Sequence, residues 1–162
     1  IVQCLVGSEM CIRDSPYVNF LLPSTDGNDI SLDMADLGEY KLVIFSCNHC
    51  PYAQAWEDRI IKIQEKYKSN GLSVIMISSN DALKYPEDSF PKMKERHNEK
   101  SFNFHYLFDE SQEVAKMYTA ACTPDFFLYD SEKNLVYRGQ LDGSRPGNEI
   151  TITGFDLRNA ID

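Results

Sequence analysis

Residues 41–52 read KLVIFSCNHCPY, and this stretch decides the fold. Lys41 to Ser46 is rich in β-branched and aromatic residues and predicts a buried strand. Pro51 is favoured in the first turn of a helix, where its missing amide has no intrahelical partner. An apolar stripe with helical spacing continues to about Ser69. The stretch therefore predicts a strand, a Cys-X-X-Cys pair and a helix, in that order.

Cys47 and Cys50 stand where the strand ends and the helix begins. Two cysteines three residues apart at a helix start can bring their sulfurs within bonding range. The partial positive charge of the helix N-terminus favours a thiolate, so we expect Cys47 to be the ionised, exposed thiol. An imidazolium at His49 would stabilise that thiolate further and make the disulfide more oxidising. Asn48 can donate a side-chain hydrogen bond to sulfur. The alternative for His49 is an ordinary exposed loop histidine.

Two other interpretations of the cysteine pair are open. A structural zinc site needs four ligands, usually from two such pairs, and the sequence has no second pair. Cys122 with one of the three histidines, His49, His97 or His105, would complete such a site only by coincidence. Two unrelated buried thiols are the other alternative. Reversible thiol–disulfide exchange is the predicted chemistry, with no metal and no organic cofactor.

The rest of the chain predicts alternating strands and helices. Strands are expected near residues 17–22, 30–32, 72–78, 104–108, 125–129 and 135–139, and further helices near 88–100, 109–118 and from Thr153 onward. This order indicates an α/β fold with a central mixed sheet and helices on both faces. Thr123-Pro124 opens a strand and is a candidate cis peptide, although the sequence alone favours a trans turn.

The first fifteen residues, IVQCLVGSEMCIRDS, lack strand or helix periodicity. Residues 5–14 match, residue for residue, the translation of a transposon-type sequencing adapter. We therefore expect residues 1–15 to be non-native and residues 16–162 to form the domain. On this interpretation the authentic N-terminus is missing, and a signal peptide is neither seen nor excluded.

The length and net charge of the chain exclude some classes of protein. A chain of 162 residues is one domain, and its net charge of −9 disfavours binding to nucleic acid. No apolar run is long enough to cross a membrane, so a soluble and cytoplasmic protein is expected. Composition leaves the oligomeric state and the compartment open.

Four segments together resemble a known family: CNHCPY at 47–52, SSNDALKYPEDSF at 78–90, ACTPDFFLYD at 121–130 and RGQLDGSRPGN at 138–148. They are similar to the thioredoxin superfamily, and more closely to the peroxiredoxin-like, AhpC/TSA-related redoxins. The resemblance implies a thioredoxin-like fold with an N-terminal β-hairpin. It also implies that the native chain continues past residue 162 and is truncated here. It implies that Cys47 attacks, that Cys50 resolves, and that Pro124 is a cis-proline facing the disulfide, with Thr123 beside it. Cys122 would then lie near the pair.

The sequence also departs from the family patterns. A peroxiredoxin places Thr three residues and Pro seven residues before its peroxidatic cysteine, but Ile44 and Tyr40 stand there when counted from Cys47. Counting from Cys50 does not restore the pattern. Ile44 also occupies about the strand position of the buried acid of typical thioredoxins, and Ser46 replaces the usual tryptophan. We expect both the peroxide-binding hydroxyl and the buried acid to be missing.

The predicted function is a thiol–disulfide oxidoreductase that acts on protein or small-molecule disulfides and draws electrons from an external thiol reductant. The first alternative is an antioxidant thiol peroxidase, in which Cys47 or Cys50 attacks a hydroperoxide. The second is a copper-handling protein that uses both thiols with His49.

Overall fold

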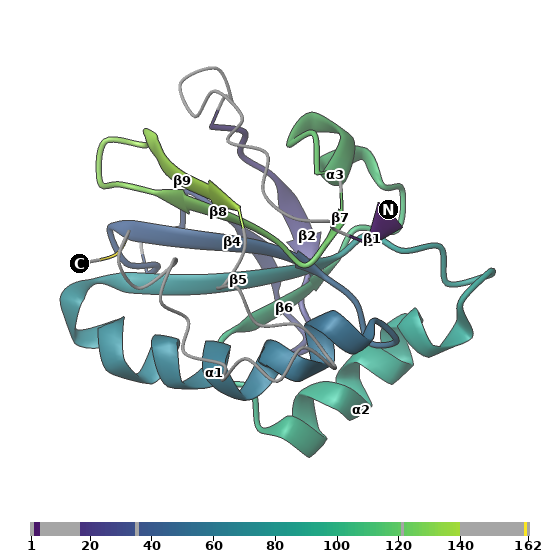
Figure 1. Cartoon of the computed structure of the whole chain (residues 1–162). Coiled ribbons are helices and arrows are strands. Elements are labelled where there is room, and N and C mark those ends of the chain that lie inside the picture. The colour runs from purple at the N-terminus through teal and green to yellow at the C-terminus, as the bar shows by residue number, and fades with distance from the viewer. Residues whose placement is uncertain (1, 4–16, 35, 121, 140–160, 162) are drawn as a thin grey trace.

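The computed structural model describes residues 2–3, 17–34, 36–120, 122–139 and 161 (Figure 1). Its centre is a five-stranded sheet with the strand order β6-β5-β4-β8-β9. The strands are β4 (Tyr40–Ser46), β5 (Leu72–Ser78), β6 (His105–Phe108), β8 (Asp125–Tyr129) and β9 (Leu135–Gly139). β4, β5 and β6 run parallel, whereas β8 is antiparallel to both β4 and β9. The predicted mixed sheet is confirmed.

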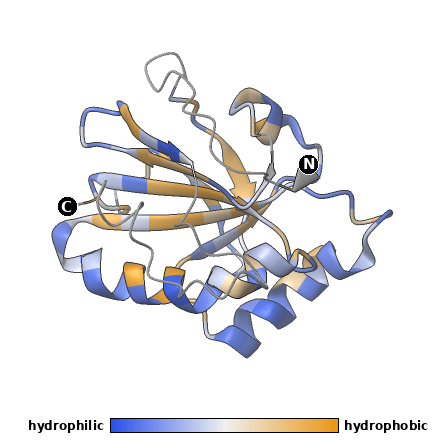
Figure 2. Ribbon diagram, viewed as in Figure 1, coloured by the Kyte–Doolittle hydropathy of each residue, from blue (hydrophilic) through white to orange (hydrophobic). Residues whose placement is uncertain are grey.

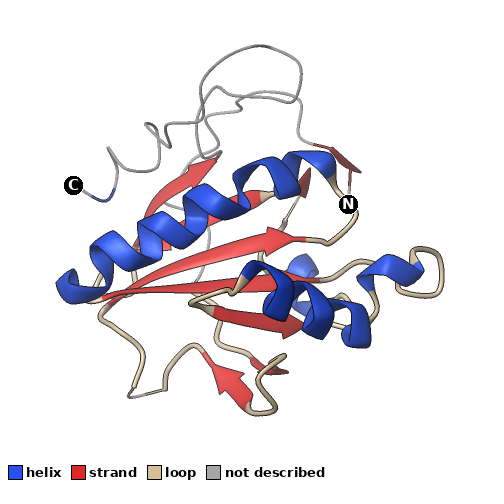
Figure 3. Ribbon diagram, turned by 90° about the horizontal axis from the view of Figure 1, so that it is seen from below, coloured by secondary structure: helices blue, strands red, loops and turns tan. Residues whose placement is uncertain are grey.

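Helices cover both faces of this sheet. α1 (Pro51–Tyr67) and α2 (Phe90–Lys100) lie together on one face, as Figures 1 and 3 show from two directions. α3 (Glu113–Met117) lies on the other face. The predicted N-terminal hairpin is present as β2 (Leu21–Pro23) and β3 (Asp29–Ser31), and it packs on the same side as α3.

The central strand β4 is buried on both sides. Leu42 and Ile44 belong to the apolar cluster beneath α1 and α2, and Val43 and Phe45 belong to the cluster beneath α3. This arrangement explains why the strand reads as a continuous apolar run instead of an alternating one. In Figure 2 the apolar colour follows the strands, and the outer surfaces of α1 and α2 are mostly hydrophilic.

The predicted end of the first helix is also confirmed. α1 ends at Tyr67, a 3₁₀ turn η2 (Lys68–Asn70) continues it, and Gly71 follows with φ of 84°. Glycine takes this left-handed conformation without the steric cost that a Cβ would bring. None of the helices in the described ranges has the length and apolar character that a membrane crossing requires.

Two predictions fall on segments that are largely outside the described residues. The helix from Thr153 lies within residues 140–160, which are not described. Of residues 1–15 only β1 (Val2–Gln3) is described, and it pairs in parallel with β7 (Cys122–Thr123). That the first fifteen residues are non-native stays a prediction.

The ends of three strands meet at one edge of the sheet. Ser46, the last residue of β4, pairs with Ser78, the last residue of β5. Phe45 pairs with Asp125 at the start of β8. The cysteine motif, the loop after β5 and the Thr123-Pro124 segment therefore converge at this edge, the usual place for ligand sites in such sheets.

Candidate redox-active site

Cys47 and Cys50 lie in the junction between β4 and α1, as predicted, but both are buried. Both are free thiols, and Cys47 is 1% and Cys50 3% exposed. Tyr52 and Ala53 from the first turn of α1 pack against them. Cys50, and not Cys47, is the residue that precedes the first turn of the helix. The expectation that Cys47 is the exposed thiol nearer the helix start is wrong, because the last residues of β4 lead it beneath the surface.

Thr123 contacts both sulfurs from the opposite side. Its peptide bond to Pro124 is cis, as the family resemblance implies. The Thr123 hydroxyl lies 3.7 Å from Sγ of Cys47, and the Thr123 carbonyl oxygen lies 3.6 Å from Sγ of Cys50. Thr123, the residue before the cis bond, thus forms one wall of the site. Cys122 occupies β7 two residues before Pro124, and its side chain is not among those described.

A buried carboxylate is hydrogen-bonded to the backbone of the cysteine motif. Asp88 is the last residue of the 3₁₀ turn η3 (Pro86–Asp88) and is fully buried. Its Oδ1 accepts hydrogen bonds from the backbone amides of Asn48 at 2.7 Å and His49 at 3.1 Å. Its Oδ2 accepts one from the Asn80 side chain at 3.0 Å and contacts Nδ1 of His49. Ile44 occupies the strand position of the buried acid of typical thioredoxins, and Asp88 brings a different buried carboxylate from the loop after β5.

Asn48 forms hydrogen bonds with neighbouring elements and not with a cysteine sulfur. Its side-chain amide donates to the carbonyl of Glu87 at 2.8 Å, and its Oδ1 accepts from the hydroxyl of Tyr106 at 2.8 Å. The side chain of Gln54 donates to the Asn48 carbonyl at 2.6 Å. The predicted hydrogen bond from Asn48 to a cysteine sulfur is therefore replaced by bonds that fix the turn.

His49 is built into the site and is not a free loop histidine. Its ring stacks on Tyr85 with centroids 4.5 Å apart and planes 11° apart. A ring nitrogen of His49, an oxygen of Asp88 and Sγ of Cys47 all lie within 4.8 Å of one another. The side chain is still about one-third exposed to solvent. A proton on His49 would offset the carboxylate charge that faces Cys47.

The two sulfurs differ in their affinity for a proton. The hydrogen bond to Cys50, burial and the charge of Asp88 together raise the pKa of Cys47. The hydrogen bond from Cys47 lowers the pKa of Cys50 to about 5 against the effect of burial, and the amides of Ala53 and Tyr52 assist. The reduced pair therefore holds its proton on Cys47 and its negative charge on Cys50. This order is opposite to the predicted thiolate at Cys47.

A metal ion would find few free ligands beside the sulfurs. Cys47, His49 and Asp88 form a group of potential ligands among the described residues. A carboxylate offers about four acceptor positions, and four donors already occupy those of Asp88. Asp88 is thus an acceptor for the protein's own hydrogen bonds. The copper hypothesis depends on the two sulfurs and His49 alone and stays a prediction.

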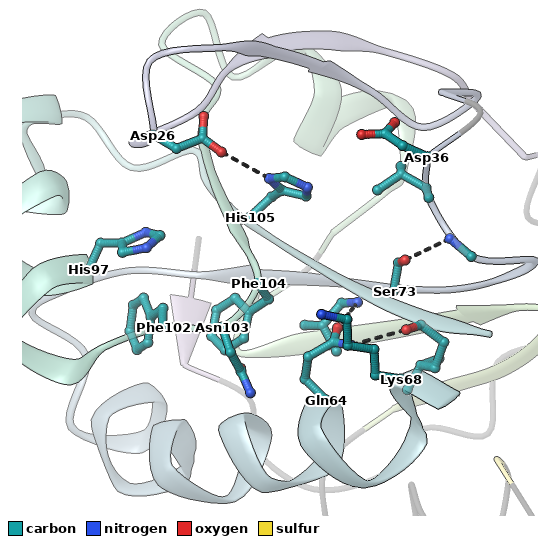
Figure 4. Close-up of a pocket in the computed structure, with 14 residues that line it drawn as sticks. Asp26, Asp36, Gln64, Lys68, Ser73, His97, Phe102, Asn103, Phe104 and His105 are labelled. Atoms are coloured by element: carbon teal, nitrogen blue, oxygen red, sulfur yellow. Dashed lines mark hydrogen bonds and ion pairs between the residues drawn. The ribbon is translucent and has the colours of Figure 1, made fainter. Parts of the chain in front are cut away.

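A separate cavity of about 500 Å³ lies away from the cysteines (Figure 4). Its polar groups largely satisfy one another: His105 pairs with Asp26 at 3.2 Å, and His97 bonds to the hydroxyl of Thr25 at 2.7 Å. It contains no residue of the cysteine motif. This cavity and the cysteine pair are therefore separate features of the described structure.

The chain is also similar to several known proteins. Residues 14–138 match the model of the AhpC/TSA family. An uncharacterised conserved protein from Geobacillus kaustophilus is 43% identical over 88% of this chain and 76% of its own, with a TM-score of 0.84. A hypothetical protein from Sinorhizobium meliloti 1021 is 42% identical over 91% of this chain and 80% of its own, with a TM-score of 0.87.

A more distant likeness supports the fold alone. A putative thiol:disulfide interchange protein DsbE from Chlorobium tepidum is 18% identical over 91% of this chain and 93% of its own, with a TM-score of 0.72. A search of curated proteins gave no significant match. The predicted thioredoxin-like fold is confirmed.

Proposed function

The chain belongs to the AhpC/TSA family, and from that premise we propose that it is a thiol–disulfide oxidoreductase whose redox couple is Cys47–Cys50. The observation that carries the proposal is the pair of free thiols at the junction of β4 and α1, faced by Thr123 on a cis-proline segment. Its partners are protein or small-molecule disulfides, and an external thiol restores the reduced form.

The proposed reaction begins from a Cys47 thiol hydrogen-bonded to a Cys50 thiolate. As Cys47 attacks a substrate disulfide, its proton passes along that hydrogen bond to Cys50, and one substrate thiolate leaves. The leaving thiolate takes the proton from Cys50. The Cys50 thiolate then attacks Sγ of Cys47, forms the protein disulfide and releases the second substrate thiolate. Two electrons pass to the substrate, and no charge has to enter the buried site from solvent.

A thiol peroxidase is the alternative function. Neither cysteine has the threonine that presents a hydroxyl to a bound peroxide in the peroxiredoxin pattern, since Ile44 stands three residues before Cys47. Thr123 does bring a hydroxyl to 3.7 Å from Cys47, but from another element. Reduction of insulin disulfides and consumption of hydrogen peroxide, measured side by side with the same reductant, separate the two functions. We expect insulin reduction to be the faster; peroxide consumption alone would overturn the proposal.

His49 is proposed to stabilise negative charge on the cysteine pair. When protonated, it offsets the charge of Asp88 that faces Cys47. His49→Ala is expected to raise the pKa of Cys47 and to make the disulfide harder to reduce. Since the side chain is partly exposed, the equilibrium constant with glutathione should change only about twofold to fivefold. This range corresponds to the free energy that partly exposed ion pairs contribute.

A matched control for His49 exists in the same chain. His105 also pairs with a carboxylate, that of Asp26, and its side chain is 30% exposed against 33% for His49. His105→Ala should leave the equilibrium with glutathione unchanged. If His49→Ala and His105→Ala behave alike, His49 acts only as a surface histidine.

A further inference from the structure

The strongest unassigned feature is the carboxylate of Asp88. It is fully buried, and it joins the backbone of the cysteine motif to the loop after β5. Three of its four donors, the two backbone amides and the Asn80 side chain, are neutral groups. Only His49 can carry a positive charge there. An oxygen of the Asp88 carboxylate lies within 4.8 Å of Sγ of Cys47, and its charge acts on that thiol.

Other titratable groups near the sulfurs do not cancel this charge. Cys50 itself carries the thiolate of the reduced pair, and the Tyr106 hydroxyl is held as a neutral donor to Asn48. Glu57 is a further carboxylate on α1, and Arg96 is its partner. Among the described residues that act on Cys47, Asp88 and Cys50 are the charges that oppose ionisation, and the charge of Asp88 has the larger effect.

Reduction of the pair changes the charge beside Asp88. The disulfide is neutral; two electrons and one proton convert it to a thiol at Cys47 and a thiolate at Cys50. A fixed negative charge in a protein interior disfavours the form that carries the additional negative charge. Less stable reduced cysteines give a lower reduction potential and a better reductant.

We propose that Asp88 is a positioning residue that keeps the Cys47–Cys50 couple reducing, so that electrons pass from this protein to substrate disulfides. This inference rests on the proposed function and adds to it the direction of electron flow. Asp88 is closed off from solvent. It acts through the two amides that it holds and through the charge that it places next to Cys47.

Two substitutions separate the charge of Asp88 from its shape. Asp88→Asn keeps the size and loses the charge, whereas Asp88→Glu keeps the charge and changes the size. The equilibrium of each variant with reduced and oxidised glutathione gives its reduction potential. For Asp88→Asn we expect the reduced form to be favoured at least about tenfold more than in the wild type, or ~30 mV for a two-electron couple. Asp88→Glu should stay closer to the wild type than Asp88→Asn does.

A buried carboxylate elsewhere in the same region serves as the control. Asp109 is 1% exposed and accepts hydrogen bonds from the Ser79 hydroxyl at 2.7 Å and the Ala115 amide at 3.0 Å. Asp109→Asn should destabilise the fold in a thermal melt without changing the potential. A second neutral variant, Asp88→Ser, should shift the reduction potential in the same direction as Asp88→Asn. It replaces Asp88→Asn in the test if the asparagine variant does not fold.

The outcomes distinguish this inference from the proposed function. An unchanged potential in both neutral variants, or an equal shift in Asp88→Glu, would show that Asp88 acts through shape alone and would overturn the inference. If wild-type Cys47 and Cys50 form no disulfide in the glutathione buffers, the proposed function fails instead.

Discussion

Cys47→Ser is expected to abolish the reduction of protein disulfides, and Cys50→Ser to stop the reaction after one turnover with the substrate still attached to Cys47. The first variant lacks the sulfur that attacks, and the second lacks the sulfur that resolves the mixed disulfide. Insulin reduction in the presence of a thiol reductant should fall to the uncatalysed rate in both. Mass spectrometry of Cys50→Ser should show a covalent adduct that added dithiothreitol removes. Cys11→Ser, which removes a thiol from the segment predicted to be non-native, should retain full activity.

Because both thiols are buried, the alternative in which Cys50 attacks the substrate and Cys47 resolves the mixed disulfide also has to be tested. The pKa of Cys50 is lowered to about 5, so Cys50 holds the thiolate at rest. If Cys50 attacked first, Cys47→Ser would accumulate the mixed disulfide and Cys50→Ser would accumulate none. Multiple turnovers by either variant would contradict a two-cysteine mechanism.

Arg96→Met is expected to destabilise the fold by about 3–5 kcal/mol, the usual cost of a buried charge that has lost its partner. Glu57 on α1 is 2% exposed, and Arg96 on α2 binds both of its oxygens, at 3.2 and 2.5 Å. Burial raises the pKa of Glu57 although Arg96 opposes the shift. The variant leaves this carboxylate inside the protein without its guanidinium. Denaturant unfolding at neutral pH measures the loss.

The stability lost in Arg96→Met should be largest at neutral pH and smaller at acidic pH. A carboxyl group whose folded pKa is raised binds protons more readily in the folded than in the unfolded protein. Stability lost in Arg96→Met should therefore be recovered as the pH falls through the raised pKa of Glu57 toward the ordinary carboxyl pKa. Glu57→Gln should restore part of the stability when combined with Arg96→Met at neutral pH, since it removes the unpaired charge.

An exposed ion pair on the same helix provides the comparison. Lys92 and Glu95 lie 2.8 Å apart, and their side chains are 55% and 57% exposed. Lys92→Met should change the free energy of unfolding by less than about 1 kcal/mol, because exposed pairs contribute little. A loss in Arg96→Met as small as in Lys92→Met would contradict the account of Glu57 as a buried charge that needs its partner.

The sequence predicted the framework of the site because its signals are local. A run of β-branched residues, two cysteines and Pro51 within twelve positions define β4, the motif and α1 without long-range information. The strands expected at residues 125–129 and 135–139 are equally local signals, and both predictions agree with the structure. Thr123-Pro124 required the family resemblance, because nothing in the local sequence favours a cis bond over a trans one.

The environment of the cysteines could not be predicted in the same way. Asp88 reaches His49 across 39 positions of sequence, and only the parallel pairing of β4 with β5 brings their loops together. The segment SSNDALKYPEDSF pointed to this loop through the family resemblance but gave no role to its acid. Burial of Cys47 likewise depends on what packs around it, so its 1% exposure could not be predicted from the local sequence.

If Cys47 and Cys50 form one redox couple, a redox titration should show both thiols being oxidised together. The protein would be equilibrated with glutathione buffers of graded potential, and the free thiols at Cys47 and Cys50 alkylated and located by mass spectrometry. The account predicts that both cysteines lose reactivity together, in a single transition with the slope of a two-electron couple, as one intramolecular disulfide forms. Separate transitions for Cys47 and Cys50, or glutathione adducts in place of the Cys47–Cys50 disulfide, would contradict it.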